Sequence, residues 1–184
     1  MLRKTDPSLT RRRLLALGAP ALLMLSPLAK AAQAAVAPER QLSFYNIHTG
    51  EKLSRVYWAE GRYIDPALQE IDVILRDWRT DEVAPMNRDL LDLLHDLHAS
   101  MDSREPFHVI SGYRSPKTNA KLRQKSNGVA KKSLHMRGMA IDVALPGRKL
   151  EHLRQAAIDL KSGGVGIYRK SGFIHVDVGR VRFW

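Results

Sequence analysis

Between Pro106 and Trp184, turns that contain glycine divide the sequence into short runs of apolar and β-branched residues. Short runs of this kind are typical of strands, whereas longer stretches with apolar residues every three or four positions are typical of helices. Strands are expected over Phe107–Ile110, Met139–Leu145, Val165–Tyr168 and Phe173–Val178, and helices over Thr118–Asn127 and Lys149–Ser162. The last two strands should form a hairpin around Arg169–Gly172. This half of the chain therefore mixes strands and helices.

The part before Pro106 predicts another hairpin and two further helices. The hairpin strands are Gln41–Ile47 and Leu53–Trp58, joined by the turn His48–Glu51. Asp65 and Pro66 predict a helix start with Asp65 as the N-cap, and apolar residues follow at helical spacing as far as Trp78. The second helix carries an apolar stripe of Leu90, Leu91, Leu94 and Leu97. We expect an α+β fold, with helices packed on a small, largely antiparallel sheet.

Residues 1–34 have the architecture of a signal peptide. Arg11–Arg13 stand directly before the apolar run Leu14–Leu28. Ala32–Ala34 offers a cleavage pattern near Ala34, with Ala29–Ala31 as a second candidate. The apolar run is too short to span a membrane, and the adjacent arginines indicate a twin-arginine export signal, with an ordinary secretory leader as the alternative. We expect a leader over 1–34, a short tether over 35–40 and a single domain over 41–184, located in the periplasm without an integral membrane segment.

The formal charge of +11 is carried partly by the leader. Residues 1–34 hold six of the 30 Lys and Arg and one of the 19 Asp and Glu, so the rest of the chain carries +6. An excess of this size suits an anionic polymer such as the cell wall as well as it suits nucleic acid. The chain has no cysteine, which excludes disulfides and leaves only nitrogen and oxygen atoms to hold a metal ion.

One face of the expected strand Met139–Leu145 is unusual. Alternation puts Asp142 on that face between two alanines, which is a poor way to build a core but leaves space above the carboxylate. His135 lies seven residues earlier, and Gly138 between them would let the backbone turn closely. We expect the imidazole of His135 to lie over the face that carries Asp142.

His175 and Asp177 likewise share one face of the last expected strand. Two imidazoles and one carboxylate, from His135, His175 and Asp142, would leave a zinc ion with an open position for water. Bound zinc lowers the pKa of that water to about 7 and polarises a carbonyl, so amide hydrolysis is the expected chemistry. Each of these residues, taken alone, also has a structural interpretation. His135 could cap a loop, Asp142 could accept backbone hydrogen bonds, and His175 could be a core histidine whose hydrogen bonds are satisfied.

Ser133–Asp142 matches the pattern S-x-H-x-x-G-x-A-x-D and resembles the zinc D-alanyl-D-alanine peptidases, a fold group that includes phage endolysins and Hedgehog. Ser111–Ser115, Gly163–Gly166 and Phe173–Asp177 resemble, more narrowly, the YcbK-like (MepK) murein endopeptidases. The likeness extends through most of the chain after the leader.

The resemblance implies a periplasmic Zn²⁺ enzyme that hydrolyses peptide cross-links between peptidoglycan stem peptides, as an L,D-endopeptidase acting on links between two diaminopimelate residues. By motif position, His135, Asp142 and His175 correspond to the zinc ligands. Arg114 corresponds to an arginine that faces the substrate in related peptidases, although a structural salt bridge is an alternative role.

The sequence departs from the wider group at Gly172, where a Glu or Asp acts as general base. Asp177 is the substitute we expect, with orientation of His175 as its alternative role. The missing base favours a second hypothesis, a catalytically inactive zinc-containing module that binds the cell wall; a D,D-carboxypeptidase or endopeptidase is a third. Lys131 and Lys132, beside the ligand motif, either meet stem-peptide carboxylates or form a solvated face. A nucleic-acid partner is not expected.

Overall fold

The computed structural model describes residues 39–126 and 128–184. The expected leader and most of the expected tether lie outside these residues, and β1 begins at Arg40, inside the segment expected to be tether. The strands are β1 Arg40–Asn46, β2 Lys52–Ala59, β3 Arg62–Tyr63, β4 Phe107–Ser111, β5 Ala140–Ala144, β6 Gly164–Tyr168, β7 Phe173–Asp177 and β8 Arg182–Phe183. The helices are α1 Asp65–Ile74, α2 Arg88–Ser100, α3 Pro116–Lys125, α4 Leu150–Asp159 and the short 3₁₀ helix η2 Leu134–Arg137. No helix in this part of the chain is both long and apolar enough to cross a membrane.

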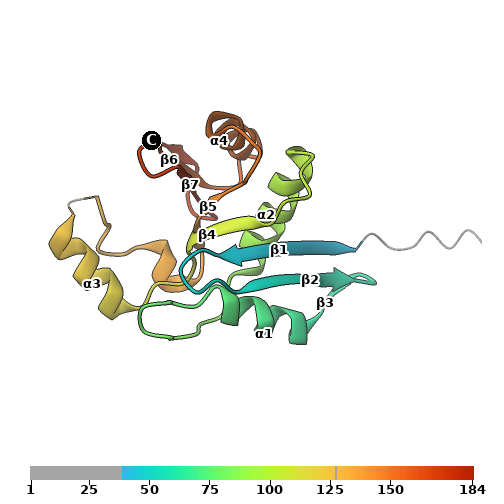
Figure 1. Ribbon diagram of the computed structural model, residues 1–184, viewed down its shortest axis with the longest axis horizontal. Helices are drawn as coiled ribbons and strands as arrows, with labels where there is room; N and C mark the ends of the chain where they lie inside the picture. The colour runs from blue at the N-terminus through green and yellow to red at the C-terminus, as the bar shows by residue number, and fades with distance from the viewer. Residues whose placement is uncertain (1–38, 127) are drawn as a thin grey trace, which may run out of the picture. The chain divides into compact units, whose positions relative to one another are not determined.

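All eight strands form one sheet, in the order β3-β2-β1-β4-β5-β7-β6-β8. The pairs β1–β4 and β6–β8 are parallel and the other five adjacent pairs are antiparallel. The α+β class is therefore confirmed, but the sheet is mixed and larger than expected. The β1–β4 pair is parallel because β2, β3, α1 and α2 lie between these strands in the sequence and return the chain to the end of the sheet where β1 begins (Figure 1).

The helices α1, α2 and α4 pack against the sheet. α1 packs against β2, α2 against β1, and α4 against β6 and β7. Between them and the sheet lies a core that includes Phe44, Leu90, Ile141 and Ile174, none of which is exposed. Because Ile141 belongs to this core, strand alternation directs its neighbour Asp142 to the opposite face.

The bounds of three helices differ from the sequence prediction, and one of them, α4, ends at Asp159 rather than at Ser162. α1 takes Ile64 as its N-cap, with Asp65 in the first turn, and ends at Ile74, so Trp78 lies outside the helix. α3 begins at Pro116 because the hydroxyl of Ser115 accepts a hydrogen bond from the Thr118 amide. It ends at Lys125, before the chain returns to η2.

Candidate metal centre

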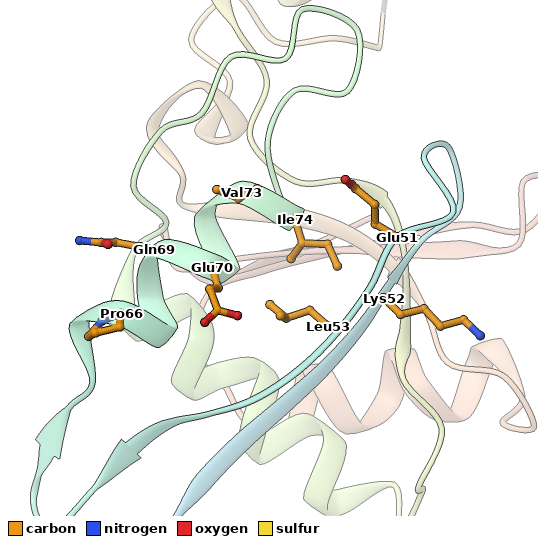
Figure 2. Close-up of a pocket in the computed structure, with 8 residues that line it drawn as sticks. All are labelled: Glu51, Lys52, Leu53, Pro66, Gln69, Glu70, Val73 and Ile74. Carbon is orange, nitrogen blue, oxygen red and sulfur yellow. The ribbon is translucent and has the colours of Figure 1, made fainter.

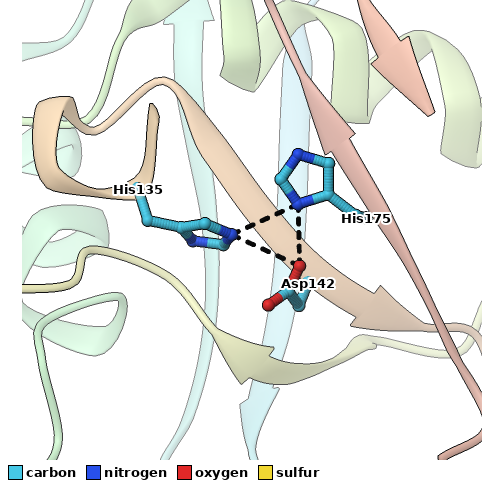
Figure 3. Close-up of side chains that lie close together, drawn as sticks. All are labelled: His135, Asp142 and His175. Atoms are coloured by element: carbon cyan, nitrogen blue, oxygen red, sulfur yellow. Dashed lines mark hydrogen bonds and ion pairs between the residues drawn. The ribbon is translucent and has the colours of Figure 1, made fainter. Parts of the chain in front are cut away.

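The side chains of His135, Asp142 and His175 converge, as Figure 3 shows. His175 Nδ1 lies 2.9 Å from Asp142 Oδ1 and 3.2 Å from His135 Nε2. His135 Nε2 lies 3.3 Å from the same carboxylate oxygen. All three residues are buried, so three potential ligand atoms meet in a small space with little access to water.

The backbone explains why these residues meet. Asp142 on β5 and His175 on β7 are direct partners in the antiparallel register, so their side chains lie next to each other on one face. His135 sits in η2, which Gly138 ends with a φ of +62°. A Cβ at Gly138 would lie 2.2 Å from the carbonyl oxygen of Pro85, so the turn that positions His135 requires glycine.

Hydrogen bonds on the far side of each ring fix its orientation. His135 Nδ1 lies 2.8 Å from the carbonyl oxygen of Gly112, which can only accept, so Nδ1 carries the hydrogen. His175 Nε2 lies 2.9 Å from Asp177 Oδ2 and donates to that carboxylate. In the neutral rings, His135 Nε2 and His175 Nδ1 therefore present lone pairs to each other and to Asp142. Three lone-pair donors in contact repel unless a cation lies among them, and the donor set fits a divalent metal ion.

The surroundings of Asp142 favour the ionised form of its carboxylate. Burial alone would raise its pKa, but the charges and hydrogen bonds of His135 and His175 outweigh burial and hold the pKa well below its ordinary value. In His175, burial lowers the pKa of the imidazole, whereas the carboxylates of Asp142 and Asp177, as hydrogen-bond acceptors and negative charges, raise it above its ordinary value. The cluster thus keeps an anionic oxygen ready for a cation.

Asp177 lies on the opposite side of His175 from this cluster, and its side chain is fully buried. Its Oδ1 accepts hydrogen bonds from the backbone amides of Gly164 and Gly179, at 3.0 and 2.9 Å. Arg182 donates to both oxygens at 3.0 and 2.6 Å. Burial would raise the pKa of Asp177, but these donors and His175 hold it well below its ordinary value. The lone pairs of Asp177 are thus engaged by these donors and by His175 Nε2, the ring nitrogen on the far side from the cluster.

Arg114 lies on the other side of Asp142. Its Nη2 is 3.4 Å from Asp142 Oδ2 and 3.4 Å from Ser111 Oγ, and its side chain is almost completely buried. Its Nε has no hydrogen-bond partner among the described residues. Burial lowers the pKa of Arg114 and the nearby Asp142 charge opposes that effect; a guanidinium stays protonated under such a shift. Arg114 is thus a buried cation with donors to spare beside the cluster.

The segment around Asp77 holds the backbone on both sides of Arg114. Asp77 is 1% exposed and accepts hydrogen bonds from the backbone amides of Ser115, at 2.9 Å, and Arg79, at 3.1 Å. On the other side, the Tyr113 amide donates to the carbonyl oxygen of Leu75 at 2.7 Å. The position of Arg114 therefore depends on a buried carboxylate far away in the sequence.

Asp77→Ala should lower the free energy of unfolding by about 2–3 kcal/mol, because it leaves buried amide donors without acceptors. Urea unfolding measures this change. Asp96→Ala, which removes an exposed carboxylate of α2, is the matched control and should change stability by less than about 0.5 kcal/mol. Equal unfolding midpoints for the two variants would contradict the role given to Asp77.

A pocket of about 480 Å³ opens over the cluster. One wall is aromatic, with Tyr168 stacked on Phe173 at 4.7 Å between ring centroids, and Trp184 5.3 Å from the His175 ring. The loop between α3 and η2 also lines the pocket. Within the described residues, Asp142 is the only Asp or Glu that lines this pocket. Gly172, where the wider group has its base, lies in the β6–β7 turn with a φ of +72°.

A second cavity, of about 510 Å³, lies between β2 and α1 (Figure 2). Leu53 and Ile74 form its apolar floor, while Glu51, Lys52 and Glu70 stand around it. Glu51 is already paired with Arg76 at 2.8 Å. The cavity shares no residue with the metal cluster, so we place the chemistry at the first pocket.

Sequence reasoning did not identify Asp77 or Arg182 as parts of the site. Asp77 falls just beyond α1, in a segment expected to continue as helix. Arg182 follows Asp177 by five residues, and an acid followed by a base is too common on protein surfaces to indicate a buried pair. Trp184 also lines the pocket.

Comparison with known proteins agrees with this geometry. The family model described as Peptidoglycan L,D-endopeptidase MepK matches residues 33–184. The Peptidoglycan L,D-endopeptidase MepK of Escherichia coli strain K12 is 39% identical over 175 residues, covering 95% of this chain and 96% of the relative. The Probable peptidoglycan L,D-endopeptidase MepK of Haemophilus influenzae is 39% identical over 176 residues, covering 95% of each protein. The chain belongs to the peptidoglycan L,D-endopeptidase MepK family.

Proposed function

We propose that this protein is a zinc-dependent peptidoglycan L,D-endopeptidase that hydrolyses cross-links between two diaminopimelate residues. The observation that carries the proposal is the convergence of three lone-pair donors, from His135, Asp142 and His175, beneath a pocket large enough for a peptide. Membership of a family described by this activity supports the substrate.

Zinc is the metal we propose, bound on the sheet face that carries Asp142 and His175. In a tetrahedral site with bonds of about 2.0–2.1 Å, neighbouring ligand atoms lie about 3.3 Å apart. The contacts of 2.9, 3.2 and 3.3 Å in the cluster are close to that spacing, which supports a single ion shared by the three residues. Three protein ligands leave a coordination position for water, as catalytic zinc sites do.

The residues around the cluster suit hydrolysis of an amide. Zinc held here would supply a Lewis acid for the scissile carbonyl and a bound water of lowered pKa. Arg114, which lines the pocket, would donate N–H groups of its guanidinium to the carbonyl oxygen as negative charge develops there. Gly112 O and Asp177 keep the two imidazoles in the tautomers that ligation requires. The aromatic wall offers apolar surface to the rest of the substrate.

For Asp177 we propose a positioning role rather than the role of general base. It accepts hydrogen bonds from two backbone amides, from Arg182 and from His175 Nε2, the ring nitrogen that points away from the cluster. A carboxylate in this place orients His175 and increases its basicity toward a metal. The pocket wall does not include Asp177.

Asp177→Asn separates these roles. We expect zinc affinity to fall about 10–100-fold, measured by competition with a chromophoric chelator, because the hydrogen bond that fixes His175 is weakened. At saturating zinc, kcat should recover to within about tenfold of the wild type. Asp159→Asn, on an exposed residue of α4, is the control. Unchanged zinc affinity with a large loss of kcat would instead identify Asp177 as the base.

We also propose that residues 1–34 export the chain to the periplasm by the twin-arginine route, supported by Arg11–Arg13 before an apolar run. A fusion of these residues to a reporter that is active only after folded export provides the test. Export that persists when all three arginines become lysine would contradict the twin-arginine route.

Digestion of defined muropeptide dimers, followed by mass spectrometry, tests the activity. We expect cleavage of dimers linked between two diaminopimelate residues, and at most slow cleavage of D-alanyl-diaminopimelate links. Preferred cleavage of D-alanyl links would replace the proposal by a D,D-endopeptidase. Binding to both dimers without any product at any zinc concentration would favour a non-catalytic module. That hypothesis is supported by Gly172, which has no acidic side chain at the position of the base in the wider group.

A further inference from the structure

A long acid-free segment surrounds α3. After Glu105 the next acidic residue in the sequence is Asp142, and the 36 residues between them contain eight Lys and Arg. Six of these cations lie on α3 or on the loop that follows it, and all six are exposed: Lys117, Lys121, Arg123, Lys125, Lys131 and Lys132. Within residues 39–126 and 128–184, none of the six forms an ion pair. Much of the positive charge of the domain is therefore gathered in one place.

Three of the cations form a stripe along α3. Lys117, Lys121 and Lys125 follow one another at intervals of four residues, so they share one helix face. Thr118 and Asn119 are buried and hold the other side of the helix against the protein. At a rise of about 1.5 Å per residue, the stripe extends over about 12 Å. In Figure 1, α3 lies at the left, apart from α1, α2 and α4.

The stripe opposes the stability of its own helix. Lysines four residues apart repel one another, and no carboxylate of α3 relieves the repulsion. Lys117 also lies in the first turn, where the helix dipole favours anions and where no acidic residue is present. Lys125 lies in the last turn, where the dipole favours a cation, but the repulsion along the stripe and the cation in the first turn are not compensated within the helix. This uncompensated charge points to a partner outside the chain.

The stripe continues toward the candidate active site. The segment after α3 lines the pocket through Ser126, Gly128, Ala130 and Lys132. An anionic chain lying along α3 would therefore extend directly to the pocket over His135. Charges spread over this length suit a polymer with repeated anionic groups better than a single small ion.

We propose that Lys117, Lys121 and Lys125 dock the protein on insoluble peptidoglycan by binding free carboxylates of stem peptides next to the cross-link that is cleaved. The inference rests on the proposed function, since it places the substrate polymer along α3. Residues 116–132 contain no aromatic side chain, so the stripe lacks the stacking surface that single-stranded nucleic acid requires.

The test compares two triple variants of equal net charge. Lys117→Gln/Lys121→Gln/Lys125→Gln removes the stripe, and glutamine has a helix propensity close to that of lysine. Lys52→Gln/Lys149→Gln/Lys161→Gln removes three exposed lysines outside α3 and is the matched control. Co-sedimentation with purified sacculi measures docking, and cleavage of a soluble diaminopimelate-linked dimer measures the catalytic site alone.

At low ionic strength, the α3 variant should bind sacculi about tenfold more weakly than wild type, while the control binds within about twofold. The difference should vanish near 0.5 M NaCl, where the Debye length falls to about 4 Å. Cleavage of the soluble dimer should be equal for all three proteins. Since sedimentation needs no cleavage, failure of the wild type to cut the dimer would reject the proposed function without deciding the docking role.

Three results would overturn the docking role. The first is wild-type binding to sacculi by the α3 variant. The second is an equal loss in both variants, which would mean that net charge alone governs binding. The third is a preference of the wild type for duplex DNA over sacculi at physiological salt, lost only in the α3 variant, which would assign the stripe to nucleic acid.

Discussion

His135→Ala should bind almost no zinc and cleave a diaminopimelate-linked dimer on the order of 10³-fold more slowly than wild type. Without one of its three ligands the metal is lost, and with it the several kcal/mol by which a bound metal stabilises the transition state. Each 1.4 kcal/mol corresponds to about a tenfold change in rate. Metal content by mass spectrometry and initial rates of dimer cleavage measure the two effects. His152→Ala, on an exposed face of α4, is the matched control and should keep both properties.

His135 is the most informative ligand to remove because it belongs to a single turn of 3₁₀ helix rather than to the sheet. Its loss leaves the β5–β7 pairing and the Asp142–His175 contact intact, so a folding defect is not expected. A variant that folds, contains no zinc and still cleaves at the wild-type rate would rule out His135 as a ligand of a catalytic ion.

Arg114→Gln should lower kcat about 10²-fold while leaving zinc affinity within a few-fold of wild type. The Arg114 guanidinium contacts the Asp142 oxygen that does not contact His175, and Arg114 lines the pocket. The substitution should therefore destabilise the transition state, which lowers kcat, without weakening metal binding. Single-turnover cleavage at saturating zinc and chelator competition separate the two.

Arg114→Lys is the matched variant for this experiment, since it keeps the charge but loses the planar fork of donors. It should recover only part of the lost activity. If Arg114→Gln instead released zinc and kept its activity once zinc was resupplied, Arg114 would be a structural partner of Asp142 and not a group that meets substrate.

Side chains alternate between the two faces of β5 and β7, and this alternation explains the part of the site that the sequence predicted. Ile141 and Ile174 enter the core, and so Asp142 and His175 had to share the opposite face. The glycine at Gly138 indicated the turn that brings His135 over them, and that glycine does adopt a positive φ. The local sequence pattern was sufficient to predict that Asp142 and His175 lie together, because each of them alternates with core residues along its strand.

Long-range geometry explains what the sequence left out. The parallel pairing of β1 with β4 depends on where two helices return the chain, and β3 and β8 have two residues each, too few for a periodic pattern. The surroundings of Asp177 depend on Arg182 reaching back from β8. Without that contact in view, a carboxylate beside His175 on the same strand face had two possible roles. Tertiary contacts favour the positioning role.

Zinc titration of metal-free protein during cleavage of a diaminopimelate-linked dimer tests the central claim most directly. A chelator should abolish cleavage, and activity should return in proportion to added zinc and level off at one ion per chain, with His135→Ala showing no recovery. Cleavage at the full rate by protein shown to contain no metal would contradict a catalytic ion held by His135, Asp142 and His175.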